Sequence, residues 1–215
     1  MPVTTIAIGG FSSNSGKTTL LCELLRRLGP GWEAIKTTRG HYRSCGKDAR
    51  TCCVSHLLSD EPLVRTGRAG TDAPGKDTGH YWDAGAENVH WVVATDAQVE
   101  PGIRAALARV KAAGVLVEGN SFTEYVPVDF FVIAARASGG KIKPTARRAL
   151  TRTDAIYLFD DLNVGPVAAR AQFDAWAANS PERELLSPIP VYTANELPQL
   201  AGRVRAALEG AVAVA

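Results

Sequence analysis

One short segment constrains the fold of this chain more than any other. Residues 10–19 read Gly-Phe-Ser-Ser-Asn-Ser-Gly-Lys-Thr-Thr. An apolar run at 3–9, typical of a buried strand, precedes them, and leucines at helical spacing follow. Those leucines are Leu20, Leu21, Leu24, Leu25 and Leu28, and Gly29-Pro30 ends the helix. This order of strand, small-residue loop and helix predicts an α/β fold with an anion-binding turn after its first strand.

The loop contains what a phosphate-binding loop (P-loop) needs. Small side chains let successive backbone N–H groups converge on phosphate oxygens, and the helix N-terminus adds its dipole. We expect Lys17 to reach the β- and γ-phosphates of a nucleotide and Thr18 to offer a hydroxyl to Mg²⁺, which prefers oxygen ligands. A turn that merely starts a helix is the alternative. The residues expected to hold the nucleotide are Gly10, Ser13, Asn14, Ser15, Gly16, Lys17, Thr18, Thr19 and Lys36.

The rest of the chain alternates strands and helices. Further strands are predicted at 32–38, 89–94, 114–118, 130–134, 155–159 and 190–193, and further helices at 103–112, 168–178 and 196–208. This alternation predicts a mostly parallel sheet covered by helices on both faces, as in P-loop NTPases. A length of 215 residues suits a single domain, 1–215. A Cys/His-containing segment at about 39–74 breaks the rhythm and is predicted to be an insertion loop.

Charge and composition exclude several classes of function. A net charge of +2 gives no overall electrostatic case for binding nucleic acid or membranes. The first residues lack the basic and apolar regions of a signal peptide, and no apolar run is as long as a membrane span. We therefore expect a cytoplasmic protein, in which the four cysteines are thiols or metal ligands rather than a disulfide framework.

Two carboxylates are candidates for holding Mg²⁺ and supporting phosphoryl chemistry together with Lys17. Asp77 begins a helical stretch in Gly75-Lys76-Asp77-Thr78, and an ordinary helix N-cap is the alternative interpretation. Glu118 ends an apolar strand, at the sheet edge where α/β proteins bind ligands, and a solvated strand-end charge is the alternative. Lys36 ends the second strand, where it is either an anion contact or an exposed lysine.

Two family resemblances follow from these motifs. The spacing Gly-x5-Gly-Lys-Thr resembles that of dethiobiotin synthetase and the cobyrinic acid diamide synthases. The ordered set Gly16-Lys17-Thr18-Thr19, Ile35-Lys36-Thr37, Gly75-Lys76-Asp77-Thr78 with Ala84-Gly85-Ala86, and Leu116-Val117-Glu118-Gly119 resembles MobB, the GTP-binding adaptor of molybdopterin-guanine dinucleotide biosynthesis.

The MobB resemblance covers about residues 3–120. It implies GTP with Mg²⁺, a homodimer, and a molybdopterin nucleotidyltransferase as partner. The Asn-Lys-x-Asp motif that reads guanine in related GTPases is not present as such. Asp160 or Asp161 is the candidate for that role, and the residues themselves leave GTP and ATP open.

A second cluster of chemically active side chains lies in the predicted insertion. Zn²⁺ favours four thiolate or imidazole ligands in a tetrahedron, and metal binding would order a loop of low apolar content. A set of reduced thiols is the alternative, and a redox pair or a shared iron–sulfur cluster are further ones. The cluster consists of His41, Cys45, Cys52, Cys53 and His56, of which the last four are the zinc candidates. Cys22, beside the leucines, is expected in the core.

Three functions are consistent with these motifs. The first is a MobB-like GTP-binding protein and slow GTPase in molybdenum cofactor biosynthesis, in which Lys17, Asp77 and Glu118 act on the nucleotide. The second is an ATP-dependent ligase or kinase of the dethiobiotin synthetase type. The third is a metallochaperone GTPase that carries its cargo on the Cys/His loop.

Overall fold

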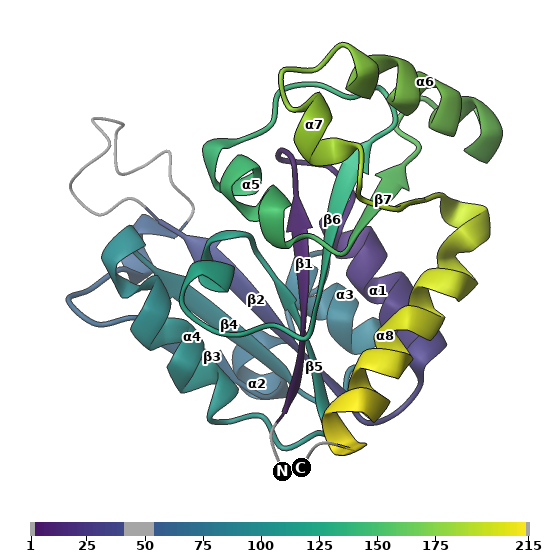
Figure 1. The fold of residues 1–215 in the computed structure, drawn as a ribbon. Coiled ribbons are helices and arrows are strands. Elements are labelled where there is room, and N and C mark those ends of the chain that lie inside the picture. Colours follow the sequence, from purple (N-terminus) through teal and green to yellow (C-terminus); the bar gives the residue numbers. More distant parts are fainter. Residues whose placement is uncertain (1–2, 41–53, 214–215) are drawn as a thin grey trace.

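The protein is organised around one eight-stranded sheet, seen in a computed structural model that describes residues 3–40 and 54–213 (Figure 1). The strand order is β3-β4-β2-β5-β1-β6-β7-β8, and all neighbours are parallel except β3 and β4. The strands are β1 (Thr4–Gly10), β2 (Trp32–Arg39), β3 (Leu63–Thr66), β4 (Val89–Ala94), β5 (Gly114–Glu118), β6 (Phe130–Arg136), β7 (Ala155–Phe159) and β8 (Val191–Tyr192). The mostly parallel α/β sheet expected from the sequence is confirmed.

Helices cover both faces of this sheet. One core layer joins the sheet to α1, α3 and α8, and a second layer joins its other face to α4, α5, α6 and α7 (Figure 1). The helices are α1 (Lys17–Leu28), α2 (Arg68–Thr71), α3 (Asp77–Asp83), α4 (Val99–Leu107), α5 (Pro144–Ala149), α6 (Pro166–Ala178), α7 (Arg183–Leu186) and α8 (Leu197–Ala213). None of the helices in the described ranges has the length and apolar character that a membrane span needs.

The first strand and helix form as the sequence predicts. Every residue of β1 is buried, because β5 and β6 flank it and helices cover both faces. The predicted leucines of α1 pack on the sheet, and Cys22 lies in the same core with 5% of its surface exposed. Gly29 ends α1 with a positive φ of 79°. The loop between β1 and α1 therefore opens at the carboxyl edge of the sheet, beside its middle strands.

The described part of the predicted insertion contains regular secondary structure. Leu63 and Val64 pair with Val93 and Val92, so β3 extends the sheet as an antiparallel edge strand. The strand is hard to recognise from sequence, because only two of its four residues are apolar and Pro62 precedes it. The guanidinium group of Arg65, on β3, lies 5.7 Å from the centre of the Trp91 ring on β4. This cation–π contact stabilises the pairing of the two strands.

A buried hydrogen-bonded pair, Glu33 and His90, lies near the amino edge of the sheet. Glu33 and His90 begin neighbouring strands, and Glu33 Oε2 lies 2.6 Å from His90 Nε2. The other carboxylate oxygen accepts the backbone N–H groups of Lys111 and Ala112 at 2.7 and 2.9 Å. The backbone N–H groups of Lys111 and Ala112 therefore bind Glu33 and not a helical carbonyl. This explains why α4 ends at Leu107 and not at the predicted residue 112.

The buried carboxyl of Glu33 makes stability depend on pH. Burial acts to raise the pKa of Glu33, but the hydrogen bonds from His90, Lys111 and Ala112 outweigh burial and lower that pKa. A carboxyl whose pKa is lowered in the folded state stabilises the fold above its unfolded pKa, about 4.3, and loses this contribution as the pH falls through the folded value.

We expect Glu33→Gln to unfold more easily than the wild type at pH 7, by about 2–3 kcal/mol, because it removes a buried hydrogen-bonded charge. The difference should shrink as the pH falls from about 5 toward 3. Urea unfolding at several pH values measures both effects. Equal destabilisation at pH 7 and at pH 3 would contradict this account.

Candidate functional site

The loop between β1 and α1 has a backbone that its residue types explain. Gly16 has a φ of 86°, and a Cβ there would lie 2.7 Å from the Cβ of Phe159, so only glycine fits. Asn14 also has a positive φ, 55°, which asparagine tolerates better than most residues. The fully buried Ser15 donates its hydroxyl to the carbonyl of Ser12 at 3.2 Å. The loop is thus a defined turn at the start of α1.

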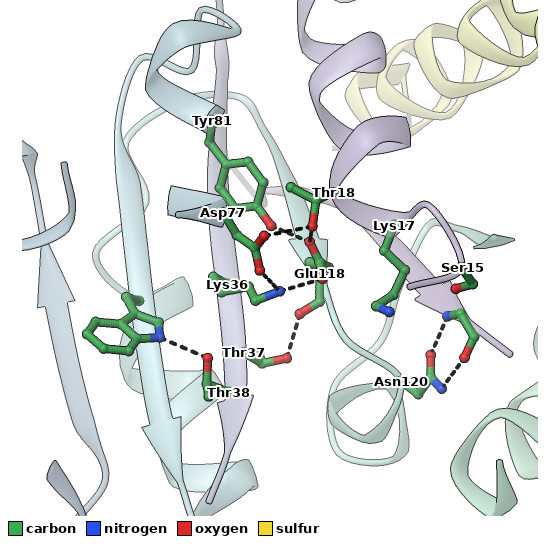
Figure 2. A network of polar contacts seen from close by, with 12 residues as sticks. Ser15, Lys17, Thr18, Lys36, Thr37, Thr38, Asp77, Tyr81, Glu118 and Asn120 are labelled. Atoms are coloured by element: carbon green, nitrogen blue, oxygen red, sulfur yellow. Dashed lines mark hydrogen bonds and ion pairs between the residues drawn. The ribbon is translucent and has the colours of Figure 1, made fainter. Parts of the chain in front are cut away.

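Side chains from neighbouring strands hold this loop in place. Asn120, two residues after β5, donates to the carbonyl of Gly10 at 2.9 Å and accepts its N–H at 2.8 Å (Figure 2). Arg136 Nε donates to the carbonyl of Asn14 at 3.1 Å, and Lys143 Nζ donates to the Ser13 hydroxyl at 2.9 Å. These contacts bind the carbonyls of Gly10 and Asn14 and so fix the position of the loop beside the sheet.

Lys17 lies folded along the loop. Its Nζ donates to the carbonyl of Ser12 at 3.3 Å. Burial lowers the pKa of Lys17, and the ammonium groups of Lys36 and Lys143 act in the same direction, whereas Glu118 and Asp77 oppose them. Among the described residues Lys17 forms no ion pair, and a partly buried ammonium of this kind is suited to receive an anionic ligand.

Beside the loop, the carboxylates of Asp77 and Glu118 both contact the ammonium group of Lys36. Lys36 and Glu118 are register partners on β2 and β5, and Lys36 Nζ lies 2.5 Å from Glu118 Oε1 and 2.5 Å from Asp77 Oδ2. The hydroxyl of Thr18 lies 3.0 Å from Glu118 Oε2 and 3.1 Å from Asp77 Oδ1 (Figure 2). Four residues that are far apart in the sequence therefore share one polar cluster.

Glu118 and Lys36 are largely buried in this cluster, and the opposite charges of Lys36 and Asp77 favour the charged forms of these two groups. Glu118 is 2% exposed, and the side chain of Lys36 is 17% exposed. Burial alone would lower the pKa of Lys36, but Glu118 and Asp77 outweigh burial and raise it. Burial acts to raise the pKa of Asp77, but Lys36 and the Thr18 hydroxyl outweigh it and lower it. The interpretations as a solvated glutamate and an exposed lysine do not hold.

Two further residues support Glu118. Tyr81 on α3 donates its hydroxyl to Glu118 Oε2, and burial next to that carboxylate raises the pKa of Tyr81 well above its ordinary value. The hydroxyl of Thr37 donates to the Glu118 carbonyl at 2.5 Å. Tyr81 follows Asp77 by four residues, so both side chains lie on one face of α3. Asp77 is the first residue of α3 and Lys76 its N-cap, so Asp77 is not the N-cap.

The loop and the polar cluster line a single cleft of about 480 Å³, which we name the main cleft. It is bounded by residues 13–19, Lys36, Asp77, Glu118 and Phe159. The main cleft brings together all the residues expected from the sequence to bind nucleotide and Mg²⁺ except Gly10, which lines a neighbouring cleft. Thr18, Asp77 and Glu118 present a hydroxyl and two carboxylates, which are the hard oxygen donors that Mg²⁺ prefers.

The structure does not locate the predicted zinc site. His41, Cys45, Cys52 and Cys53 lie outside the described residues. His56 lies in a short 3-10 helix, Ser55–Leu57, and is exposed. Among residues 3–40 and 54–213, no group of three or more His, Cys, Asp or Glu side chains is arranged to hold a metal ion.

The two aspartates considered for guanine recognition have local partners. Asp160 accepts the backbone N–H groups of Val164 and Gly165 at 3.1 and 2.8 Å, which shapes the turn before α6. Asp161 accepts the N–H and the hydroxyl of Ser138 at 3.1 and 2.6 Å. These bonds give both carboxylates a structural role, and a choice between GTP and ATP does not follow from them.

Sequence reasoning missed several residues of the site. Asn120, Tyr81 and Phe159 carry no motif of their own. Their positions in the sequence could have identified them. Asn120 follows β5 and Phe159 ends β7, so both stand at the carboxyl edge of the sheet, where ligands of α/β sheets bind. Tyr81 stands one helical turn after Asp77.

Removal of the Asn120 side chain should loosen the loop. Asn120→Ala deletes both hydrogen bonds to Gly10, so we expect a loss of about 1–3 kcal/mol in unfolding free energy and faster hydrogen exchange at the Gly10 amide. Thermal unfolding and amide exchange measure these effects. Asn179→Ala, which removes an exposed bond to Ala175, is the matched control and should change neither. Unchanged exchange at Gly10 would show that Asn120 is not needed to hold the loop.

Comparison with known proteins adds little to this geometry. No protein-family model and no curated protein sequence matches the chain. Ten chains of solved structures match, among them the crystal structure of the "apo" form of LpxK from Aquifex aeolicus in complex with ATP. The identity is 18%, the match covers 76% of this chain and 50% of that one, and the TM-score is 0.47. The chain thus spans about half the length of the LpxK chain, and the site stands on its own geometry.

Proposed function

We propose that the chain binds a Mg²⁺–nucleoside triphosphate in the main cleft and promotes cleavage of its terminal phosphate. One observation carries this proposal: a strand–loop–helix with the backbone of a P-loop lies beside a hydroxyl and two carboxylates at the carboxyl edge of a parallel sheet. The cleft has the size of a small-molecule site, 300–1,000 Å³ in typical proteins.

Each residue has a role in this proposal. The loop N–H groups and Lys17 hold the phosphates, and Thr18, Asp77 and Glu118 hold Mg²⁺ directly or through water. The metal supplies neutralisation of charge on the phosphate oxygens. Lys36 keeps the two carboxylates together, and its ammonium adds positive charge to the lining of the main cleft.

The first experiment is release of inorganic phosphate from ATP and from GTP by the purified protein. We expect slow, Mg²⁺-dependent release that Lys17→Ala abolishes. Absence of release together with absence of nucleotide binding would overturn the proposal. Binding without release would confine the function to nucleotide-dependent recognition.

The more specific proposal is a MobB-like GTP-binding adaptor in molybdenum cofactor biosynthesis. It rests on the sequence resemblance, and one structural fact supports it: Lys36, Asp77 and Glu118, which come from three separate motifs of that resemblance, meet in one cluster. Competition between GTP and ATP for the main cleft tests it, and a clear preference for ATP would count against it. A homodimer and a molybdopterin nucleotidyltransferase partner belong to the same proposal.

A further inference from the structure

A second cleft lies on the other side of Lys17. It measures about 160 Å³, and Lys17 is the residue that lines both clefts. Its walls come from the end of β2, the turn after β5 and the segment at the start of α5. We name it the basic cleft, because Lys17, Arg39 and Lys143 supply three cations to its lining.

The lining of the basic cleft differs from that of the main cleft in charge. None of the described residues that line the basic cleft is acidic, whereas Asp77 and Glu118 balance Lys17 and Lys36 in the main cleft. Hydroxyl groups of Ser121 and Thr145 add hydrogen-bond donors, whereas the Thr37 hydroxyl, which also lines the cleft, already donates to the Glu118 carbonyl. Arg39 does pair with Asp96 at 2.9 Å, but both side chains are exposed, 37% and 69%, so the pair is weak and Arg39 can exchange partners.

A cleft whose described lining offers three cations, two hydroxyl donors and no carboxylate fits an oxyanion. Its size suits a carboxylate or phosphate group and is too small for a nucleoside, and it lies next to Lys17, the residue proposed to hold the terminal phosphate. We propose that the basic cleft binds an oxyanion, a carboxylate or a phosphate group, of a second small molecule while the main cleft holds the nucleotide. This inference rests on the proposed function.

The inference assigns a place for an acceptor. An acceptor oxygen held in the basic cleft forms a bond to the γ-phosphorus as the bond from that phosphorus to the β–γ bridging oxygen breaks. The nucleoside diphosphate leaves with the electron pair of that bond. The class of reaction is then phosphoryl transfer to an anionic acceptor, with hydrolysis by water as the side reaction.

The test uses the full chain with a non-hydrolysable triphosphate. Affinity for the Mg²⁺ complex of the β,γ-imido analogue of ATP, or of GTP if GTP binds better, is measured first by calorimetry. With the analogue saturating, inorganic phosphate and succinate are titrated separately and followed by phosphorus and proton NMR. The two probes distinguish a phosphate group from a carboxylate as the oxyanion.

We expect at least one probe to bind saturably without displacing the analogue. Arg39→Gln should weaken that binding about tenfold, as expected for a lost charge-assisted hydrogen bond, and leave analogue affinity within twofold. Arg26→Gln is the matched control, because Arg26 is 51% exposed, pairs with Glu23 on α1 and lines neither cleft. It should leave the binding of both ligands unchanged.

Three results would overturn the inference. Displacement of the analogue by the added probe would show competition for one site and assign the basic cleft to the terminal phosphate of the nucleotide. Equal binding of the probes to wild type and Arg39→Gln, or no binding, would remove the site. Failure of the analogue itself to bind would overturn the proposed function and this inference together, and the initial calorimetry identifies that case.

Discussion

Lys17→Ala should lower the affinity for Mg²⁺–nucleoside triphosphate by about 100-fold. A hydrogen bond to a charged group contributes roughly 1.5–3 kcal/mol, which corresponds to a factor of about 10 to 100, and Lys17 is expected to contact both the β- and the γ-phosphate. Titration with a fluorescent ATP or GTP analogue measures the effect. Lys111→Ala, which removes an exposed lysine at the opposite edge of the sheet, is the control.

The same variant separates binding from folding. Burial lowers the pKa of Lys17, which means that its charged form is disfavoured in the folded protein without ligand. Removal of this ammonium should therefore leave the thermal unfolding temperature unchanged or slightly higher. A variant that is as stable as the wild type and binds nucleotide equally well would remove Lys17 from the site.

Glu118→Gln should have the second large effect, on both chemistry and stability. Glu118 is almost fully buried and receives Lys36, Tyr81 and Thr18. The neutral amide leaves Lys36 with Asp77 alone, so we expect a loss of about 2 kcal/mol, below the 3–5 kcal/mol of a buried pair that is fully broken. Mg²⁺-dependent phosphate release should fall roughly 100-fold, the scale seen when one preorganised electrostatic contact is lost.

The two effects are measured separately, by chemical unfolding and by phosphate release at saturating nucleotide. Glu100→Gln is the matched control, because Glu100 is 46% exposed and pairs with Arg104 on α4. Glu118→Gln should also make nucleotide binding less dependent on Mg²⁺. Unchanged phosphate release with reduced stability would make Glu118 a structural residue only.

Much of this site was predictable, because its parts obey local rules. The loop has a strand before it, a helix after it and glycine at the position of positive φ, so its conformation follows from nearby residues. Glu118 ends β5 as predicted, and parallel pairing places Lys36 opposite it. Lys36 does not end its strand as the sequence suggested, because β2 continues to Arg39.

What the sequence did not reveal depends on contacts between distant segments. The bond of Asn120 to Gly10 joins residues 110 positions apart, and no local pattern encodes it. The end of α4 depends on hydrogen bonds to Glu33, which lies more than 70 residues earlier. The edge strand β3 depends on its pairing with β4. The basic cleft likewise brings together Arg39, from the end of β2, and Lys143, from the start of α5, and neither segment contains a motif.

Equilibrium dialysis of the wild-type protein against ATP and GTP, with Mg²⁺ and with excess chelator, tests the central claim most directly. We expect saturable binding of one nucleotide per chain. The binding should weaken by a factor of about ten or more when Mg²⁺ is removed, because Thr18, Asp77 and Glu118 then lose the metal that joins them to the phosphates. Absence of binding of either nucleotide in the presence of Mg²⁺ would contradict the account.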